Sequence, residues 1–234
     1  FGVAVAFRAG WAADGACVVP CAAFLGACLS LALVCAVSAL AARRTGRRGF
    51  AGGTVIVAGF VAGSFTCSLQ MLTLAYATPE ASAAAFKWVW GDLRQAAPQA
   101  LPWAAAAVLA VMVVLYAQNR RLNALALGEE TARSLGVNVR RTQLVALAAT
   151  SVATAASVAL AGAVGFLGLV VPHVVRRLVG ANHRVYLPVC ACTGALFLVA
   201  ADGVARLFPG SLPVGVVCAL TGAPFFFYLL ARKG

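Results

Sequence analysis

Long uncharged stretches, each rich in aliphatic side chains, dominate the hydrophobic pattern of the chain. They run from Gly15 to Ala42, Gly49 to Pro79, Gln95 to Asn119, Thr142 to His173, Val185 to Ala201 and Leu207 to Ala231. About 20 consecutive apolar residues are enough for a helix to cross the hydrocarbon core of a bilayer. The pattern therefore predicts an all-α fold, a polytopic transmembrane helical bundle, in which residues 1–234 form one transmembrane domain.

The charges between these stretches predict seven crossings, because Lys and Arg accumulate in the connections on the cytoplasmic side. We place the crossings at about Gly15–Ala42, Thr54–Thr78, Leu101–Ala117, Thr142–Leu160, Gly165–Val179, Leu187–Ala201 and Val214–Ala231. The fifth is short, rich in glycine and broken by Pro172, and such irregular backbone survives at membrane depth only when packed inside protein. The outer loop that contains FKWVWGDLR is expected to form a short interfacial helix.

Charge is scarce and one-sided in this arrangement. Only 10% of the 234 residues are charged, 63% are hydrophobic, and the mean hydropathy is +0.95. Of the 18 Lys and Arg residues, all but Arg8, Lys87, Arg94 and Arg206 fall on the side predicted to be cytoplasmic. Four acidic residues on the predicted outer side balance the charge of these four basic residues. The formal net charge of +12 therefore lies on the inner face. The high pI therefore reflects membrane topology, and we expect no nucleic-acid partner.

Residue patterns needed for catalysis or cofactor binding are missing. The eight cysteines lie in apolar stretches without the spacing of a zinc site, and the chain has only two histidines. Neither lysine follows a glycine, so the phosphate-binding loop G-x-x-x-x-G-K-[ST] is absent. No pair of carboxylates falls within a span to relay protons. We therefore expect no enzymatic activity, no metal site and no resident cofactor, and uphill transport would need energy from a partner.

One charged segment, ALGEETARSLGVNVRR at residues 126–141, separates two strongly apolar crossings. Gly128 is expected to interrupt the preceding helix. Glu129 and Glu130 suit the first turn of a new helix, because carboxylates stabilise a helix N-terminus. Gly136 supplies its stop. The segment should form a short helix on the cytoplasmic side, parallel to the membrane.

The spacing of side chains along this short helix predicts two different faces. Ala132 and Leu135 are three residues apart and would form the apolar side. Glu130 and Arg133 have the same spacing and would form a polar ridge. A short helix with such mixed faces suits insertion into a groove on another protein.

Four stretches of the sequence, taken in order and with their spacing, resemble a known family. They are LALGEETARSLGVNVRR, GAVGFLGLVVPHVVRRLVGANHRVYLP, GALFLVAADGVAR and LPVGVVCALTGAPFFFYLL. Over almost the whole chain they resemble the FecCD-type permease subunit of binding-protein-dependent ABC importers for iron siderophores, haem and vitamin B12. The resemblance implies a ten-span permease fold, of which this chain would hold about seven spans, with the N-terminal spans missing.

The resemblance also implies roles for particular residues. The stretch from Gly128 to Gly136 matches the coupling helices that carry movement of the ATPase pair into the permease. Its candidate contact residues are Gly128, Glu129, Glu130, Arg133, Leu135 and Gly136. Arg206 matches an outer-face arginine that pairs with an acidic residue of the binding protein, although an ion pair with Asp202, one turn away, explains it equally well.

Further matched positions fall along the implied translocation pathway. Ser64 and Ser68, one turn apart in the second crossing, are candidates for lining it, with helix packing as the alternative. Gly52 and Gly53 match the position of an inner gate, and glycine would make that turn flexible. Ser211 stands where the family usually has an acidic residue, which removes one outer-face charge but retains a residue able to cap a helix.

The resemblance therefore predicts the permease subunit of an ATP-driven importer for iron-siderophore, haem or cobalamin-type cargo, working by alternating access at a permease dimer interface. The implied partners are two copies of a cytoplasmic ATP-binding subunit, a second permease copy (identical or a paralogue), an extracytoplasmic substrate-binding protein and the lipid bilayer. The implied location is the bacterial inner membrane. The alternative is an ion-coupled secondary transporter, for which the glycine-rich stretch Gly162–Gly168 offers the only interrupted helix.

Overall fold

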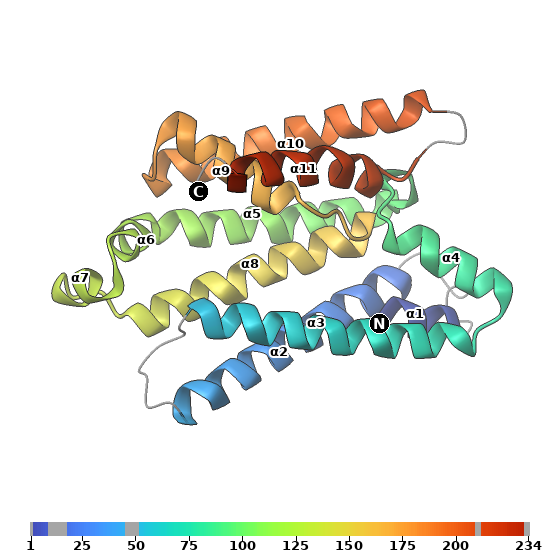
Figure 1. Ribbon diagram of the computed structural model, residues 1–234, viewed down its shortest axis with the longest axis horizontal. Helices are drawn as coiled ribbons and strands as arrows, with labels where there is room; N and C mark the ends of the chain where they lie inside the picture. The colour runs from blue at the N-terminus through green and yellow to red at the C-terminus, as the bar shows by residue number, and fades with distance from the viewer. Residues whose placement is uncertain (1, 9–17, 45–51, 209–211, 232–234) are drawn as a thin grey trace.

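The computed structural model describes residues 2–8, 18–44, 52–208 and 212–231, and every regular element within these ranges is a helix. The helices are α1 (Gly2–Arg8), α2 (Val18–Arg44), α3 (Gly52–Ala75), α4 (Pro79–Val89), the 3₁₀ turns η2 (Leu93–Gln95) and η3 (Pro98–Ala100), α5 (Leu101–Ala117), α6 (Asn119–Ala126), α7 (Glu129–Ser134), α8 (Val139–Ala161), α9 (Leu167–Val179), α10 (His183–Leu207) and α11 (Val214–Ala231). In Figure 1 most of the long helices run along one axis, with short helices at both ends. The predicted all-α bundle is confirmed.

The predicted crossings correspond to α2, α3, α5, α8, α9, α10 and α11. Those at Leu101–Ala117 and Val214–Ala231 have the observed helix bounds. Among the described residues, four helical segments are long and apolar enough to cross a membrane: Val57–Ala75, Pro98–Ala117, Val139–Ala161 and His183–Leu207. Shorter apolar stretches lie in α2 and α11. The sequence pattern located the spans because each is a run of apolar residues bounded by charges.

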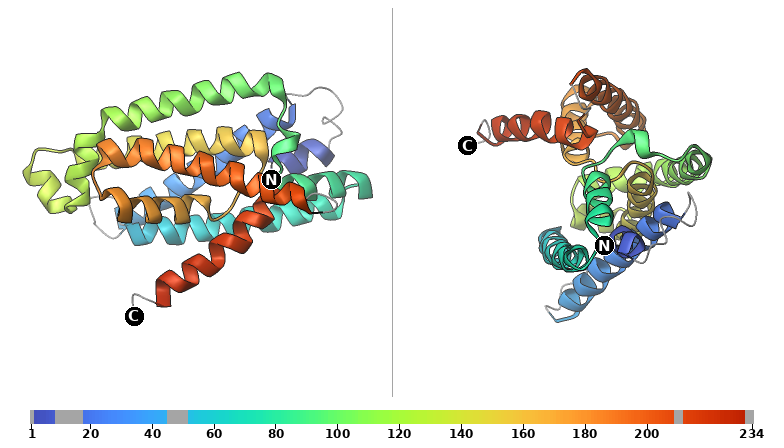
Figure 2. Two further views of the ribbon diagram at one scale, coloured as in Figure 1. Left: turned by 90° about the horizontal axis from the view of Figure 1, so that it is seen from above. Right: turned by 90° about the vertical axis from the view of Figure 1, so that its right-hand side faces the viewer.

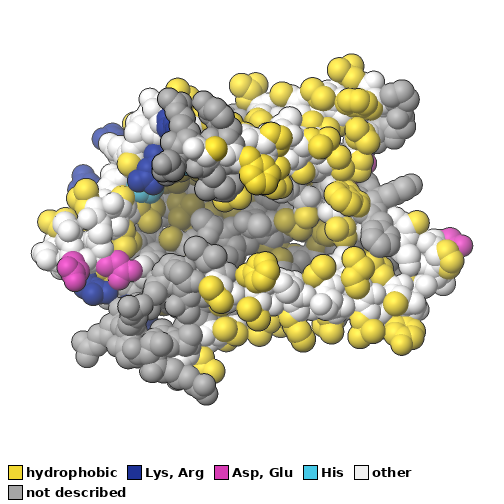
Figure 3. All heavy atoms as spheres, in the orientation of Figure 1, with side chains coloured by type: hydrophobic (Ala, Val, Ile, Leu, Met, Phe, Trp, Pro, Cys, Tyr) yellow, Lys and Arg dark blue, Asp and Glu magenta, His cyan; other side chains and the backbone are white. Residues whose placement is uncertain are grey.

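In Figure 3 most of the visible charged side chains gather at one end of the long axis, an acidic side chain lies at the other end, and many hydrophobic side chains lie on the surface between them. One end holds α6 and α7 and the other holds α4 (Figure 1). We call these the inner and the outer end, because the excess of arginine marks the cytoplasmic side. Four predicted inner residues, Arg47, Arg48, Arg232 and Lys233, lie outside the described residues. The arrangement is that of a multi-pass membrane protein.

The fifth predicted crossing, Gly165–Val179, is a short helix preceded by extended backbone. With 13 residues, α9 is about 20 Å long, whereas the hydrocarbon core is about 30 Å thick. The helix begins after Phe166, which has a left-handed backbone conformation (φ 63°). Pro172 lies within the continuous helix, so the expectation that it breaks the helix is wrong. Because proline has no backbone N–H, Pro172 removes one backbone hydrogen bond from the helix. Burial of the Val175 side chain helps to hold α9 in place.

Three glycines bring separate segments into backbone contact at the outer end. Gly91 follows α4, Gly162 follows α8, and Gly215 lies in the first turn of α11. A side chain on Gly162 would collide with the carbonyl oxygen of Trp88, and one on Gly215 with that of Trp90. The N–H of Gly215 donates to the carbonyl oxygen of Gly91 at 3.4 Å. We call Gly91, Gly162 and Gly215 the glycine junction.

At the inner end, α6 and α7 form a hairpin that packs on the start of α8. Buried Ala124, Ala132 and Val139, one from each helix, form a small apolar cluster. Ala132 is 0% exposed, but Leu135 is 63% exposed. The expectation that Ala132 and Leu135 form one apolar side is therefore wrong, because only Ala132 is packed within the protein. Leu135 lies just after the last residue of α7, Ser134, and caps the helix.

Replacing Gly215 by alanine is expected to destabilise the protein by about 1–3 kcal/mol, because the added methyl group collides with backbone that cannot move aside. The same change at Gly203 in α10, where no atom lies within 4 Å of the added carbon, should instead stabilise it by up to about 1 kcal/mol through helix propensity. Thermal unfolding in detergent compares the two variants. Equal melting temperatures would contradict a tight glycine junction.

Replacing Ala132 by leucine should overfill the cluster between α6, α7 and α8 and destabilise the protein by about 1–3 kcal/mol. Leu135→Ala removes an exposed side chain and should change the stability by less than about 0.5 kcal/mol. Thermal unfolding of both variants measures the difference. A larger loss with Leu135→Ala than with Ala132→Leu would show that α7 packs by the opposite face.

Candidate functional site

Glycines fix both ends of α7. Gly128, the N-cap residue, has φ 114° and ψ 151°, a conformation that side chains other than hydrogen rarely allow. Gly136 has φ 77°, and its N–H donates to the Arg133 carbonyl oxygen at 2.9 Å. The N–H of Val137 donates to the Ala132 carbonyl oxygen, also at 2.9 Å. These two bonds are a Schellman motif, so α7 ends sharply at the predicted glycine.

Glu129 connects α7 to α8. Its carboxylate accepts a bond from Arg133 Nη2 at 3.1 Å and another from Gln143 Nε2 at 2.9 Å. Glu130 and Arg133, the residues of the expected polar ridge, are both exposed, and Arg133 forms its ion pair with Glu129, four residues earlier. An exposed pair of this kind contributes at most about 0.5 kcal/mol. The bond to Gln143 matters more for geometry, since it holds the hairpin against the first turns of α8.

Three side chains of the hairpin point away from it at the inner end. Leu127 is 70% exposed and Leu135 is 63% exposed. Glu130 is also exposed, and no ion pair joins its carboxylate to another residue in the described ranges. Leu127 was not among the sequence candidates, although its place just before Gly128 could have pointed to it. The hairpin therefore presents two apolar side chains and one carboxylate on a backbone fixed by two glycines.

Arg206 lies at the outer end of α10 and pairs with Asp202. Its Nε and Nη2 atoms both lie 2.7 Å from Asp202 Oδ2. The intrahelical pair that the spacing suggested is thus present. The Arg206 side chain is still 58% exposed, whereas that of Asp202 is 17% exposed. The guanidinium group of Arg206 is therefore accessible to a partner. Ser211, which stands where the family usually has an acidic residue, lies outside the described residues.

The candidate pathway residues all lie on α3. Ser64 and Ser68 are exposed, and the Ser68 hydroxyl donates to the Ser64 carbonyl oxygen at 3.0 Å. Gly52 and Gly53 form the first turn of this helix. Both glycines are α-helical in the structure, and their role in a flexible inner gate stays a prediction.

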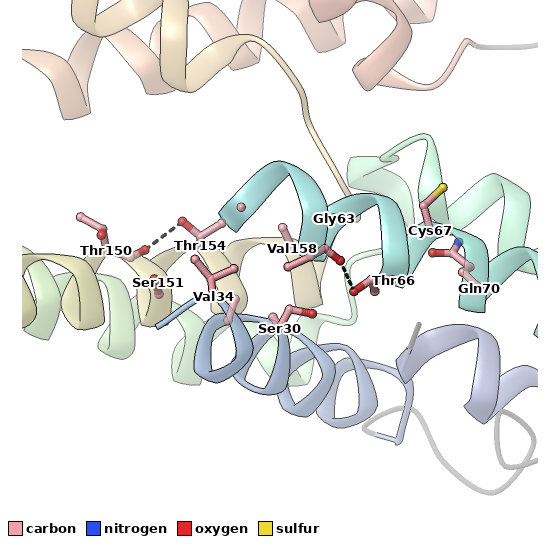
Figure 4. Close-up of a pocket in the computed structure, with 14 residues that line it drawn as sticks. Ser30, Val34, Gly63, Thr66, Cys67, Gln70, Thr150, Ser151, Thr154 and Val158 are labelled. Atoms are coloured by element: carbon pink, nitrogen blue, oxygen red, sulfur yellow. Dashed lines mark hydrogen bonds between the residues drawn. The ribbon is translucent and has the colours of Figure 1, made fainter. Parts of the chain in front are cut away.

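A cavity of about 470 Å³ lies between α2, α3 and α8, on a face of α3 that does not include Ser64 or Ser68 (Figure 4). Polar side chains in its wall bond to their own helices: hydroxyls of Ser30, Thr66, Thr150 and Thr154 donate to carbonyl oxygens four residues earlier, at 2.7–3.0 Å. Gly59 and Gly63 also line it, and side chains there would meet open space. Their four-residue spacing places both on one face of α3.

Groups able to hold a metal ion do not occur in the described part of the chain, where no three His, Cys, Asp or Glu side chains come together. Its described cysteines are unpaired with one another and are distributed over α2, α3, α10 and α11. The arrangement thus offers protein surfaces and a cavity rather than reactive groups.

Residues 1–232 match the FecCD transport family. The cobalamin import system permease protein BtuC of Halobacterium salinarum is 50% identical over 149 residues, 64% of this chain and 40% of that protein. The hemin transport system permease protein HmuU of Yersinia pestis is 39% identical over 170 residues, 71% of this chain and 51% of that protein. The vitamin B12 import system permease protein BtuC of Escherichia coli is 38% identical over 198 residues, 82% and 59% of the respective chains.

The fold is also similar to a solved structure, an inward-facing conformation of a metal-chelate type ABC transporter. The TM-score is 0.84 at 28% sequence identity, and the match covers 99% of this chain and 72% of that one. The chain spans about half the length of the curated relatives named above, 40–59% of each. Since the sequence match runs through nearly all of its residues and the helices follow the same path, the chain belongs to the FecCD transport family.

Proposed function

We propose that this chain forms the membrane-spanning permease of an ATP-driven importer for a metal-bearing organic chelate, of the class of cobalamin, haem or a ferric siderophore. The names of the relatives, which refer to cobalamin, hemin and vitamin B12, support the cargo class. The observation that carries the proposal is the α6–α7 hairpin. It holds exposed Leu127, Glu130 and Leu135 on fixed backbone at the inner end of a FecCD-family bundle.

The hairpin is the proposed docking element for a cytoplasmic ATPase. Apolar side chains beside a carboxylate suit a groove with an apolar floor and a basic rim. Glu129 and Arg133 bond within α6–α8 and would position the helix, while Glu130 and Leu135 would contact the partner. Gly128 and Gly136 would keep the helix short enough to enter such a groove. Two ATPase copies, one per permease, would supply energy from ATP hydrolysis, because this chain has no phosphate-binding loop of its own.

The proposed pathway lies between two permease copies. Ser64 and Ser68 are on an exposed side of α3, together with strongly exposed Phe60 and Val61. This face would meet the second copy or the cargo, and the first turn of α3, with Gly52 and Gly53, would form the inner gate. Alternating access then requires the two copies to separate at one end of the bundle at a time.

An ion-coupled secondary transporter remains the second candidate, and the non-helical backbone at residues 162–166 favours it, since interrupted helices bind ions in such proteins. Asp202 is the one carboxylate within the four long apolar segments, and it is paired with Arg206 at the outer end. The importer therefore accounts for more of the structure, because it also explains the exposed hairpin.

The full-length protein, purified by affinity from its native membranes in mild detergent, should carry an ATPase that mass spectrometry identifies. The double variant Glu130→Arg, Leu135→Arg should lose it by about tenfold or more, since charged side chains would replace both proposed contacts. The melting temperature should hardly change, because both side chains are exposed.

The matched control reverses a charge and replaces a leucine at the other end of the bundle. Glu80→Arg, Leu101→Arg alters two exposed residues at the outer end and should leave ATPase recovery unchanged. Absence of an ATPase from the wild-type preparation would count against the importer. It would favour the secondary transporter, whose uptake should follow an ion gradient instead of ATP.

Arg206 is the proposed contact for an extracytoplasmic substrate-binding protein. Arg206→Glu should weaken binding of that protein by about tenfold or more, with the loss shrinking at high salt. Asp202→Asn removes the intrahelical ion pair but keeps the guanidinium, so binding should be retained. Surface plasmon resonance with the detergent-purified permease measures both. Equal loss in the two variants would show that Arg206 serves only the pair within α10.

A further inference from the structure

A side-chain link joins the α6–α7 hairpin to α10 across 60 residues of sequence. Asn123 Oδ1 accepts the backbone N–H of His183 at 2.8 Å and lies 2.7 Å from Nδ1 of the same residue. Asn123 Nδ2 donates to Asn182 Oδ1 at 3.1 Å. One amide side chain on α6 therefore contacts both the cap and the first residue of α10.

These bonds replace part of the normal cap of α10. The first N–H groups of a helix have no partner within it. Asn182, the N-cap residue, accepts the N–H of Arg184 at 3.1 Å. The N–H of His183 is instead satisfied by Asn123. Because Asn123 Oδ1 already accepts this backbone proton, Nδ1 of His183 must carry its own proton to bond to the same oxygen. The orientation of the amide is thereby fixed.

The contacts continue from α10 to α9. The ring of His183 meets that of Tyr186 edge to face, with centroids 5.7 Å apart and an interplanar angle of 69°. The Tyr186 hydroxyl then donates to the carbonyl oxygen of Pro172 in α9, in a long bond of 3.4 Å. The hairpin is thus connected through Asn123 to α10 and α9, two membrane helices that lie later in the chain.

The hairpin has a second and separate connection to α8. It passes through the peptide chain and through the bond between Glu129 and Gln143. α8 packs mainly against α2 and α5, whereas α10 packs mainly against α9 and α11 and has a smaller contact with α5. The two connections therefore lead to two different groups of helices.

We propose that Asn123 is a positioning residue that passes movement of the α6–α7 hairpin to α10 and α9. This inference rests on the proposed function, in which an ATPase moves the hairpin. Through Glu129 the same displacement reaches α8, so both groups of helices shift together. Loss of Asn123 leaves the ATPase docked on α7 but lets the hairpin slide past the start of α10. Hydrolysis then continues with little transport.

The experiment uses the full-length permease with its ATPase and binding protein, reconstituted in liposomes. ATP hydrolysis is measured beside uptake of cyanocobalamin, haemin and ferrichrome, each tested in turn. Asn123→Ala should keep ATPase recovery and hydrolysis close to wild type, while uptake per ATP falls by about tenfold, within the usual range of coupling between sites. Asn123→Asp, which keeps an acceptor for the N–H of His183, should recover much of the uptake.

The matched control is Asn119→Ala, also on α6. Asn119 Nδ2 donates to the Tyr116 carbonyl oxygen at 2.7 Å, a bond within the same stretch of chain, so its loss should leave uptake per ATP unchanged. If Asn123→Ala cannot be recovered from membranes, Asn123→Ser serves in its place, because serine is too short to reach His183.

Three results would overturn the inference. If Asn123→Ala shows the same uptake per ATP as an active wild type, this inference is overturned while the proposed function stands. A proportional fall of hydrolysis and uptake, with a lower melting temperature, would show that Asn123 only stabilises the fold. A wild type without ATPase or ATP-dependent uptake would overturn both this inference and the proposed function.

Discussion

Within a bilayer, the backbone can find hydrogen-bond partners only inside the protein, and this constraint governs the structure. Helices satisfy it along the spans, and hydroxyls on α2, α3 and α8 bond back to their own helices instead of facing the cavity unpaired. At the outer end, the glycine junction lets backbone bond directly to backbone between segments. Irregular structure occurs where such contacts are available, as in residues 162–166 before α9.

The same constraint explains how far the sequence predicted the fold. Apolar runs bounded by charge located the helices, and Gly128 and Gly136 marked the ends of α7 because no other residue readily adopts their backbone angles. Details that depend on distant contacts were not accessible. The bonds of Asn123 join residues 60 apart, and nothing local distinguishes it from Asn119. Which side of α7 is buried also depends on α6 and α8, so the sequence could not show that Ala132 is packed while Leu135 is exposed.

Function in this fold is a matter of surfaces and their connections. The exposed part of α7 is small, but Glu129, Asn123 and the two glycines hold its position from several sides. A partner that displaces the hairpin would therefore also displace the helices bonded to it through Glu129 and Asn123. Family membership explains why the hairpin is there, and the hydrogen bonds describe what it is attached to.

The last helix shows what a one-sided attachment implies. α11 is held at Gly215 by the glycine junction and at Gly222, where Phe166 leaves no room for a side chain. From its start near the other helices, α11 runs away from them toward the C-terminus (Figure 2). The nine residues after Gly222 form a stretch about 14 Å long, so any rotation of α11 about its glycine contacts would displace the end of this stretch more than its start.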